Sequence, residues 1–550
     1  MDSAARRTAD VIVIGAGFSG LLLIRKLRDE LGLDVQAYER GSDVGGTWYW
    51  NRYPGARCDV ESMFYCFSVD SELQQEWDWS ERFPGQPELL NYFNHVADRW
   101  DSRRSIAFDT TISSARWSDE THEWTVVTDR GDTATARYLV SAVGCLSAAT
   151  LPAFPGAEDF AGPIYHTGQW PQGGVDFAGL RVGVIGTGSS GVQAIPMIAQ
   201  QAAHLTVFQR TAHYSVPARN RPLTDVERHA TKREYDLLRS IARSSSKTGL
   251  PSENQPLGPA AVVDDALLHA ELERRWWLGI SLTNTLADSF ISLEANERIA
   301  QWVRAKIRQI VDDPTTADLL ASSNYPIGTK RIIYGTDFFE TFNRPNVDLV
   351  SVVATPIEQF TTNGIVVDGR EHEFDAIVCA TGYDAITGAL ERIELRGRDG
   401  RLLSDVWAEG PKTYLGLAVH GFPNLFTVTG PGSPSVLSNM VVSIEQHVEW
   451  IVDYIERLRI DGIAWTEPEV DAQEAWVSHV NELANATLFP TAASWYMGAN
   501  VPGKPRVFLP YLGGISAYRQ KCDDVRADSY RGFAHGSGKE GQRSLQGTTA

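Results

Sequence analysis

Two glycine-rich segments constrain the fold of this chain more than any other feature of its sequence. GAGFSG at 15–20 follows the run DVIVI at 10–14, and GTGSSG at 186–191 follows LRVGVI at 180–185. Each segment has a buried-strand pattern before it and a helix-compatible run after it, which lifts a G-x-G-x-x-G match above chance. The glycines permit a tight turn and let the backbone approach a pyrophosphate at a helix N-terminus. The sequence therefore predicts two α/β units that each hold a dinucleotide.

The residues that close the second strand of each unit differ in charge. Glu39 closes the first such strand and can accept hydrogen bonds from a free ribose 2′-hydroxyl. Gln209, Arg210 and Thr211 close the corresponding strand of the second unit and suit a 2′-phosphate. We therefore expect two dinucleotides of different kinds side by side, an arrangement that indicates electron transfer.

Length, charge and cysteine content exclude several other classes of protein. A chain of 550 residues is too long for one ordinary core, so we expect two or three domains. The net charge of -19 argues against nucleic acid or an anionic membrane as a partner, and no run approaches the ~18 apolar residues of a membrane span. The five cysteines are Cys58, Cys66, Cys145, Cys379 and Cys522. Their number is odd and they form no C-x-x-C pair, which argues against a disulfide framework or a metal site and for a reducing cytoplasm.

The segment between the two glycine loops resembles a family signature. FAGPIYHTGQWP at 160–171 fits F-x-G-x-x-x-H-x-x-x-W-P, the signature of type I Baeyer–Villiger monooxygenases, which are class B flavoprotein monooxygenases. GTWYWNRYPGARCD at 46–59 and ASWYMGANVPGK at 493–504 also match the family, and the resemblance extends from about 8 to 533. The chain looks most similar to phenylacetone and cyclohexanone monooxygenases. Taken alone, His166 in this linker would be an ordinary structural histidine, whereas the resemblance assigns the linker to coupling domain motion.

The resemblance implies an α/β fold with two Rossmann-like domains, one for FAD and one for NADPH, and a helical insertion. The expected division of the chain is 8–150 with 385–533 for FAD, 151–220 with 326–384 for NADPH, 221–325 for the insertion, and a disordered tail at 534–550. Such an enzyme converts ketones, here cyclic or aryl, into esters or lactones with O2 through a C4a-peroxyflavin, with sulfoxidation as a secondary activity. We expect no nucleic acid or membrane partner, and a monomer or a weak homo-oligomer.

Arg331 is the expected catalytic residue. A peroxide that must stay deprotonated needs a fixed cation in a site drained of water, and arginine stays charged and presents a rigid fork of donors. The family places this role on the arginine of a GTKR segment, here at 328–331, and places Asp59 beside it to orient the guanidinium. On the residues alone, Arg331 would be a surface arginine at a domain boundary and Asp59 an ordinary loop aspartate.

Further residues are expected to hold the cofactors. Lys330, Arg210 and Thr211 should bind the 2′-phosphate of NADPH through charge-assisted hydrogen bonds. Trp495 should reach the nicotinamide ribose or the substrate from a mobile loop, since an indole supplies apolar area with one donor. The expected cofactor contacts are Gly15, Gly17, Phe18, Ser19, Gly20, Glu39, Gly46, Thr47, Trp48, Tyr53 and Asp59 in the first unit, and Gly186, Thr187, Gly188, Ser189, Ser190, Gly191, Arg210, Thr211, Lys330, Arg331 and Trp495 around the second.

Two alternatives remain open at this point. A disulfide oxidoreductase also pairs FAD with NADPH, but Cys58 and Cys66 are too far apart for its usual C-x-x-C pattern. A flavin-bound redox sensor or scaffold without turnover would not require both Arg331 and a 2′-phosphate site. Cys145 falls where relatives carry varied residues, and we expect it to line the substrate pocket rather than react.

Overall fold

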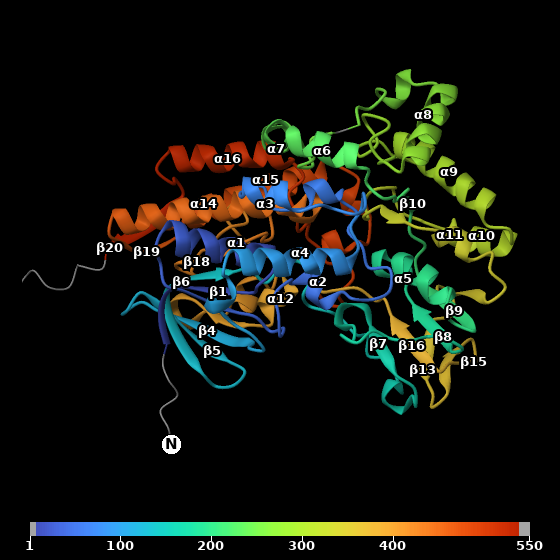
Figure 1. Cartoon of the computed structure of the whole chain (residues 1–550), viewed down its shortest axis with the longest axis horizontal. Helices are drawn as coiled ribbons and strands as arrows, with labels where there is room; N and C mark the ends of the chain where they lie inside the picture. The colour runs from blue at the N-terminus through green and yellow to red at the C-terminus, as the bar shows by residue number, and fades with distance from the viewer. Residues whose placement is uncertain (1–6, 253, 538–550) are drawn as a thin grey trace, which may run out of the picture.

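A computed structural model describes residues 7–252 and 254–537 (Figure 1). Two sheets lie side by side along the long axis of the molecule, and helices cover both (Figure 1). The helices α8 (Asp265–Leu278) and α9 (Leu293–Ile310) extend from one end of the molecule, beyond the second sheet (Figure 1).

The first sheet carries the first glycine segment at the end of its central strand. β1 (Arg7–Ile14) lies between β2 (Val35–Tyr38) and β6 (Thr133–Ser141) and is parallel to both. The strand order is β17-β4-β5-β6-β1-β2-β3, and β18 pairs with the end of β6. The other strands are β3 (Ile106–Ala107), β4 (Ile112–Ser118), β5 (Glu123–Thr128), β17 (Glu394–Arg396) and β18 (Leu425–Thr427). Strands from two distant parts of the sequence therefore share one sheet.

The second sheet carries the second glycine segment in the same way. All its strands are parallel, in the order β12-β9-β8-β16-β7. They are β7 (Ile164–His166), β8 (Arg181–Ile185), β9 (His204–Gln209), β12 (Val347–Ser351) and β16 (Ala376–Cys379). β16 is buried throughout, as expected of a parallel strand covered on both faces. The alternation of strands and helices confirms the predicted α/β class.

Smaller sheets and helices complete the described structure. The short strands form three small sheets: β10 (Ser215–Pro217) with β11 (Ile333–Gly335); β13 (Ile357–Phe360), β14 (Gly364–Val367) and β15 (Arg370–Glu373); and β19 (Ile463–Pro468) with β20 (Phe533–Ser537). The other α-helices are α1 (Phe18–Ile24), α2 (Thr47–Trp50), α3 (Ser71–Glu76), α4 (Gln86–Arg99), α5 (Ser189–Ala199), α6 (Asp225–Arg233), α7 (Tyr235–Ser244), α10 (Pro314–Leu320), α11 (Phe338–Thr341), α12 (Gly388–Glu391), α13 (Leu403–Val406), α14 (Met440–Ile460), α15 (Val470–Asn485) and α16 (Ile515–Ala527). Within the described ranges, none of the helices combines the length and the apolar character that a membrane crossing requires.

One sequence prediction about the C-terminal part needs correction. The disordered tail was expected from 534, but residues up to Ser537 form β20 and pair with β19. The remainder of that tail, 538–550, lies outside the described residues. α14 packs between α1 and α16 and is buried on most sides.

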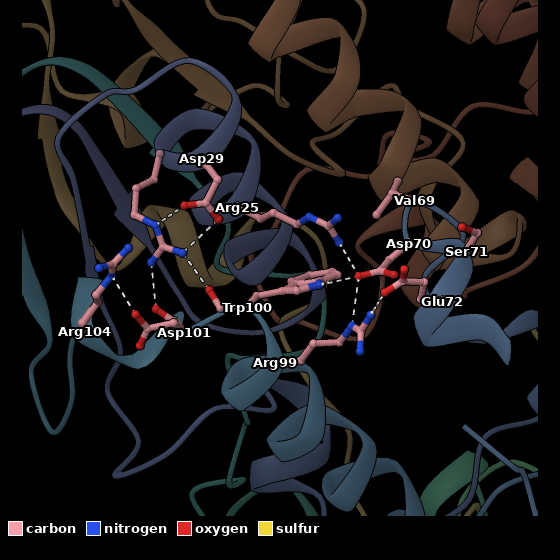
Figure 2. Close-up of a pocket in the computed structure, with 11 residues that line it drawn as sticks. Arg25, Asp29, Val69, Asp70, Ser71, Glu72, Arg99, Trp100, Asp101 and Arg104 are labelled. Carbon is pink, nitrogen blue, oxygen red and sulfur yellow. Dashed lines mark hydrogen bonds and ion pairs between the residues drawn. The ribbon is translucent and has the colours of Figure 1, made fainter. Parts of the chain in front are cut away.

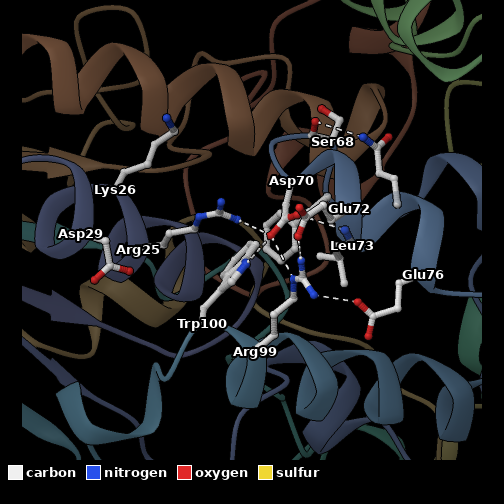
Figure 3. A network of polar contacts seen from close by, with 12 residues as sticks. Arg25, Lys26, Asp29, Ser68, Asp70, Glu72, Leu73, Glu76, Arg99 and Trp100 are labelled. Atoms are coloured by element: carbon white, nitrogen blue, oxygen red, sulfur yellow. Dashed lines mark hydrogen bonds and ion pairs between the residues drawn. The ribbon is translucent and has the colours of Figure 1, made fainter.

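A charged junction ties three helices of the first unit together. Asp70 is the N-cap of α3, where its carboxylate accepts a hydrogen bond of 3.0 Å from the Leu73 N–H. The same carboxylate pairs with Arg25 at 2.9 Å and with Arg99 at 3.2 Å, and it accepts from the Trp100 indole N–H at 3.0 Å (Figure 3). Burial opposes ionisation of Asp70, but these hydrogen bonds and the arginine charges hold its pKa at about 2.

A surface hollow of about 770 Å³ lies over this junction (Figure 2). The arginines that line it already contact carboxylates: besides the two on Asp70, Arg28 pairs with Asp29 at 2.6 Å and Arg104 with Asp101 at 3.1 Å. Because the arginine charges are satisfied by the protein itself, the hollow is a structural junction and does not present free charge to an anion.

Candidate active site

The first glycine loop has the shape that a pyrophosphate requires. Gly15 has φ +108°, and a Cβ there would lie 2.6 Å from the Ala142 carbonyl oxygen. A Cβ on Gly20 would lie 2.0 Å from the Gly15 oxygen, so strand and helix approach too closely for a side chain. α1 begins after Gly17 without a side-chain cap, which leaves the N–H groups of its first turn, starting at Phe18, without intrahelical partners. These groups and the helix dipole fit a bound anion.

The second loop repeats this construction. Gly186 also has φ +108°, and a Cβ there would lie 2.5 Å from the Ala380 oxygen. A Cβ on Gly191 would lie 2.3 Å from the Gly186 oxygen, whereas one on Gly188 would meet no atom within 4 Å. α5 begins at Ser189 without a side-chain cap. The open space at Gly188 beside an uncapped helix start fits a second pyrophosphate.

Glu39 holds the first loop in place. Its buried carboxylate accepts hydrogen bonds from the Ala16 N–H at 2.9 Å and the Gly41 N–H at 2.7 Å. Burial raises the pKa of this carboxyl group, and the two backbone donors oppose that rise. Glu39 therefore lies at the tip of the second strand as predicted, and it also shapes the loop itself.

The remaining first-unit residues form the wall around this loop. Gly46 packs directly on Gly17, where a Cβ would lie 2.9 Å from the Gly17 Cα, and Thr47 begins α2. Phe18 and Trp48 are buried in an aromatic cluster, with Phe18 lying 4.5 Å from Phe93 between ring centroids. The side chain of Phe18 is therefore part of the core, and only its backbone and that of Ser19 lie at the helix start.

A basic cluster lies beside the second loop. Arg210 is exposed at the end of β9, and the Thr187 hydroxyl donates to the Thr211 carbonyl at 3.0 Å. Lys330 lies with its Nζ 4.6 Å above the ring of Tyr325, and burial, followed by the charge of Arg210, lowers its pKa. His213 lies in the same cluster: burial and then the charges of Lys330 and Arg210 lower its pKa to about 4. Sequence reasoning missed His213, although it follows Arg210 by only three positions.

Arg331 and Asp59 form a bidentate ion pair. The Arg331 Nε donates to Asp59 Oδ2 at 2.8 Å and its Nη2 donates to the other carboxylate oxygen, while Nη1 donates to the Val436 carbonyl at 3.3 Å. The Asp59 carboxylate raises the pKa of Arg331 against the opposing effect of burial. The two residues come from segments 272 positions apart, and the fold brings them together as the resemblance implies. This arrangement holds a permanently charged guanidinium in place, with its Nε and Nη2 edge hydrogen-bonded to a carboxylate.

An apolar cluster lies against this ion pair. Cys145, Val436 and Tyr496 belong to it, together with Ala385, Ile386, Ala484, Phe489, Met497, Phe508 and Leu509. Trp495 packs on the edge of the cluster, and its ring centroid lies 4.3 Å from that of Tyr496. The Cys145 thiol is buried 3.1 Å from the Ser435 hydroxyl, and burial raises its pKa. A buried, protonated thiol of this kind is unreactive.

Tyr496 is a second residue that the sequence analysis missed. It is 2% exposed, and burial raises the pKa of its phenol while the neighbouring Arg331 charge lowers it. Its position next to Trp495 in the sequence is the signal that could have identified it.

The two dinucleotide units touch through the loop that carries Tyr53. The Tyr53 hydroxyl donates to Gln193 Oε1 at 2.8 Å, and the Gln193 amide donates to the Arg57 carbonyl at 2.9 Å. A Cβ on Gly55 would lie 2.3 Å from the Gln193 carbonyl oxygen, so the loop rests directly on α5. Burial raises the pKa of Tyr53 to about 12, opposed by a hydrogen bond with Ser190. The loop from the first unit therefore reaches the helix that follows the second glycine segment.

The linker histidine lies against Tyr383. His166 Nδ1 accepts from the Gly168 N–H at 3.0 Å, and its ring meets that of Tyr383 edge-on at 6.1 Å. Burial lowers the pKa of His166. Tyr383 donates in turn to Asn51 Oδ1 in the first unit. The linker thus packs at the contact between the units, where it supports the junction.

Comparison with known proteins places this arrangement among flavin-dependent monooxygenases. Residues 8–220 match the family model for flavin-binding monooxygenase-like proteins. A Baeyer–Villiger monooxygenase of Pseudooceanicola batsensis is 44% identical over 95% of this chain and 95% of its own length. An acetone monooxygenase (methyl acetate-forming) of Gordonia sp. is 42% identical over 96% of this chain and 99% of its own. The structure of a steroid monooxygenase bound to NADP superposes with a TM-score of 0.91 at 48% identity, covering 96% of this chain and 99% of the other.

Proposed function

Because the chain belongs to the Baeyer–Villiger group of flavin-binding monooxygenases, we propose that it oxidises ketones at the site where Arg331 and Asp59 meet the apolar cluster. The enzyme uses FAD and NADPH to insert one oxygen atom of O2 beside a ketone carbonyl, which gives an ester or a lactone. The observation that carries the assignment of the site is the bidentate ion pair, which holds the Arg331 cation against the apolar cluster.

The residues present fit both cofactors. The uncapped start of α1 and the residues around Gly17 and Gly46 would hold the FAD pyrophosphate, and Glu39 would accept from its adenosine ribose. The open space at Gly188 would hold the NADPH pyrophosphate, and the basic cluster of Arg210, Lys330 and His213 would hold its 2′-phosphate. When bound, NADPH supplies a hydride and FAD accepts it and activates O2.

Arg331 supplies the fixed cation that oxygen transfer requires. Its charge persists at any working pH because the Asp59 carboxylate raises its pKa. Asp59 and the Val436 carbonyl hold the guanidinium by three hydrogen bonds, so the fork is oriented before substrate arrives. The apolar cluster excludes water from one side of the fork, which strengthens its field. Arg331 thus binds and orients negatively charged oxygen, and Asp59 positions Arg331.

The apolar cluster beside Arg331, which includes Val436, Phe489 and Leu509, supports cyclic or aryl ketones as the substrate class. Sulfides of similar shape are a second candidate class of substrate, because transfer of an oxygen atom to sulfur gives a sulfoxide and requires no carbonyl group on the substrate. Trp495, at the edge of the cluster, would contact the nicotinamide ribose or the ketone.

We propose the domain division expected from the sequence, with 8–150 and 385–533 for FAD, 151–220 and 326–384 for NADPH, and 221–325 as the insertion. The composition of the two sheets supports it.

All the cysteines are free and buried, which supports a cytoplasmic location. A monomer or a weak homo-oligomer remains the prediction for the assembly.

Oxidation of a ketone panel under ¹⁸O2 tests the function. Cyclic, aryl and steroid ketones are incubated with the FAD-loaded enzyme and NADPH, and products are analysed by mass spectrometry. Each ester or lactone should carry one ¹⁸O atom, and NADPH consumption should depend on both ketone and O2. Hydrogen peroxide as the sole product with every ketone would refute the assignment and would favour a redox sensor or an oxidase.

A further inference from the structure

The segment 494–505 carries residues of the proposed site but has little regular structure of its own. Between α15 and α16 it forms only the short helical turn Trp495–Met497. Tyr496, in that turn, is nevertheless buried against Arg331. The internal hydrogen bonds of this segment are those of short turns, so it needs external contacts to keep one conformation. The contacts that fix it are therefore as important for the site as the residues that it carries.

Lys504 provides one of these contacts, a largely buried ion pair. Its Nζ pairs with Asp384 Oδ1 and lies 3.4 Å from Glu391 Oε2. The Lys504 side chain is 10% exposed and that of Asp384 19%, so the ion pair is largely withdrawn from water. Asn500 adds a hydrogen bond of 2.6 Å from its side-chain amide to the Tyr383 carbonyl. Both contacts bind the segment to the same dipeptide, Tyr383-Asp384.

The backbone around Asp384 is shaped to receive this carboxylate. A Cβ on Gly388 would lie 2.2 Å from the Asp384 Cγ, so only glycine leaves room for it at the start of α12. Glu391 is held in turn by the Thr387 hydroxyl at 2.8 Å. Two carboxylates at close range in a half-buried place repel each other unless a cation lies between them. Lys504 supplies that cation.

Tyr383-Asp384 is itself a fixed point of the molecule. The Tyr383 side chain packs on the linker, where a Cβ on Gly168 would lie 2.6 Å from its ring, and its hydroxyl donates to Asn51 in the first unit. The dipeptide therefore joins the linker, the first unit and the segment 494–505 at one place.

We propose that Lys504 is a positioning residue whose ion pair with Asp384 holds the segment 494–505 on this fixed point and so keeps Tyr496 against Arg331. The ion pair acts through the segment and does not touch the reacting atoms. Loss of Lys504 leaves two facing carboxylates without a counter-charge, which favours release of the segment and entry of water to the site. The inference rests on the proposed function only in explaining why this placement is useful.

Limited chymotrypsin digestion of the FAD-loaded protein tests the proposal without any substrate. Cleavage after Trp495 or Tyr496, identified by mass spectrometry, should be at least tenfold faster in Lys504→Met than in the unchanged protein. Lys504→Arg, which keeps the charge, should restore most of the protection. Lys412→Met is the matched control, because Lys412 pairs with Glu474 at 2.8 Å on an exposed surface, and it should leave the cleavage rate unchanged. Equal cleavage of Lys504→Met and Lys412→Met would refute the proposal.

A second measurement separates positioning from general stability. FAD content and melting temperature identify any variant that does not fold, and Asp384→Asn, which removes the same ion pair from the other side, then replaces Lys504→Met in the comparison with the control. In Lys504→Met the share of NADPH oxidised to hydrogen peroxide should rise at least fivefold over that of the control, because water reaches the site. An unchanged share would contradict the proposed role. The digestion assay needs no ketone, so failure of the proposed function would leave its result intact.

Discussion

At the scale of single residues, the ion pair of Arg331 and Asp59 is the feature on which activity should depend most. Arg331→Ala removes the guanidinium that binds both carboxylate oxygens of Asp59. It also removes the cation that faces the apolar cluster. Loss of one preorganised electrostatic group in such a site costs about 10²–10³ in turnover. We expect ester or lactone formation to fall by at least about 100-fold, while FAD absorbance and binding persist.

Product analysis by gas chromatography together with the flavin spectrum checks this. Arg308→Ala is a suitable control, since Arg308 is half-exposed on α9 and pairs with Asp318 at 2.7 Å. Normal product formation by Arg331→Ala would overturn the role given to it. Loss of FAD from Arg331→Ala would instead mean that the ion pair is structural.

His213 should make cofactor binding depend on pH. Its pKa of about 4 leaves it neutral at pH 7.5 when the basic cluster is empty, because burial and the charges of Lys330 and Arg210 oppose protonation. A bound phosphate dianion reverses that field and raises the pKa of His213, so binding takes up a proton. A group whose pKa rises on binding strengthens binding as pH falls. Affinity for NADP⁺ should therefore increase as the pH is lowered from 8 to 6.5. This range lies above the second pKa of the phosphate, about 6, so the phosphate itself stays mostly doubly charged.

Calorimetric titration in buffers of different ionisation enthalpy measures that proton uptake directly. His213→Gln should abolish the uptake, and NAD⁺, which lacks the phosphate, should show none in either protein. Equal uptake by His213→Gln would assign the proton to another group.

At this scale a motif fixes the place of a residue more readily than its role. The glycines of both loops lie at strand–helix turns, and Glu39 and Arg210 follow β2 and β9, as the patterns predict. Arg331 pairs with Asp59 as the resemblance implies, and the binding and catalytic roles of these residues stay predictions. Sequence reasoning failed for His213 and Tyr496, whose proximity to the site depends on the packing of a helical insertion and of a C-terminal segment. Phe18 adds a point that the motif does not show: its ring packs in the core, while its backbone N–H stays at the start of α1.

At the scale of elements, Asp70 connects the start of α3 to the ends of two neighbouring helical segments. Asp70→Ala removes the N-cap and leaves Arg25 and Arg99 without their shared carboxylate. Loss of an N-cap alone costs about 1–2 kcal/mol, and the charge-assisted hydrogen bonds add to it. We expect a clearly lower melting temperature at pH 7 for Asp70→Ala than for the unchanged protein.

The pH dependence of this effect has a defined sign. The pKa of Asp70 is about 2 in the folded protein against 3.8 for an unperturbed aspartate, so its contribution is complete above pH 5. It declines as the pH falls from 3.8 towards 2, and the difference between the two proteins should narrow there. Thermal scans at pH 7, 5, 3.5 and 2.5 check this, with Asp318→Ala as control because its side chain is 67% exposed and lies outside the junction. A difference that stays constant down to pH 3.5 and below would contradict the assignment.

At the scale of the whole molecule, the two dinucleotide units have separate hydrophobic cores. One core joins α1, α4 and α14 beneath the first sheet, and the other joins the second sheet to α8 and α9. We therefore expect two calorimetric transitions. NADP⁺ at 100 times its dissociation constant should stabilise one of them by about 2.7 kcal/mol.

NAD⁺ at the same concentration serves as the control and should move neither transition, because it lacks the 2′-phosphate. A single transition that shifts as a whole with NADP⁺ would mean that the contact between Tyr53 and Gln193 couples the two cores into one unit.

The order of strands in the first sheet has a consequence for synthesis. Leu139 to Ser141 at the end of β6 pair with β18, which begins at Leu425. The ribosome must first add every residue from 142 to 424, which takes roughly 15–60 s at ~5–20 residues per second. Throughout that interval the backbone of this strand end stays open to other partners while the second unit is completed. Newly made chains are therefore most prone to aggregate before the nascent polypeptide passes residue 427, and ample chaperone during that interval should raise the yield of active enzyme.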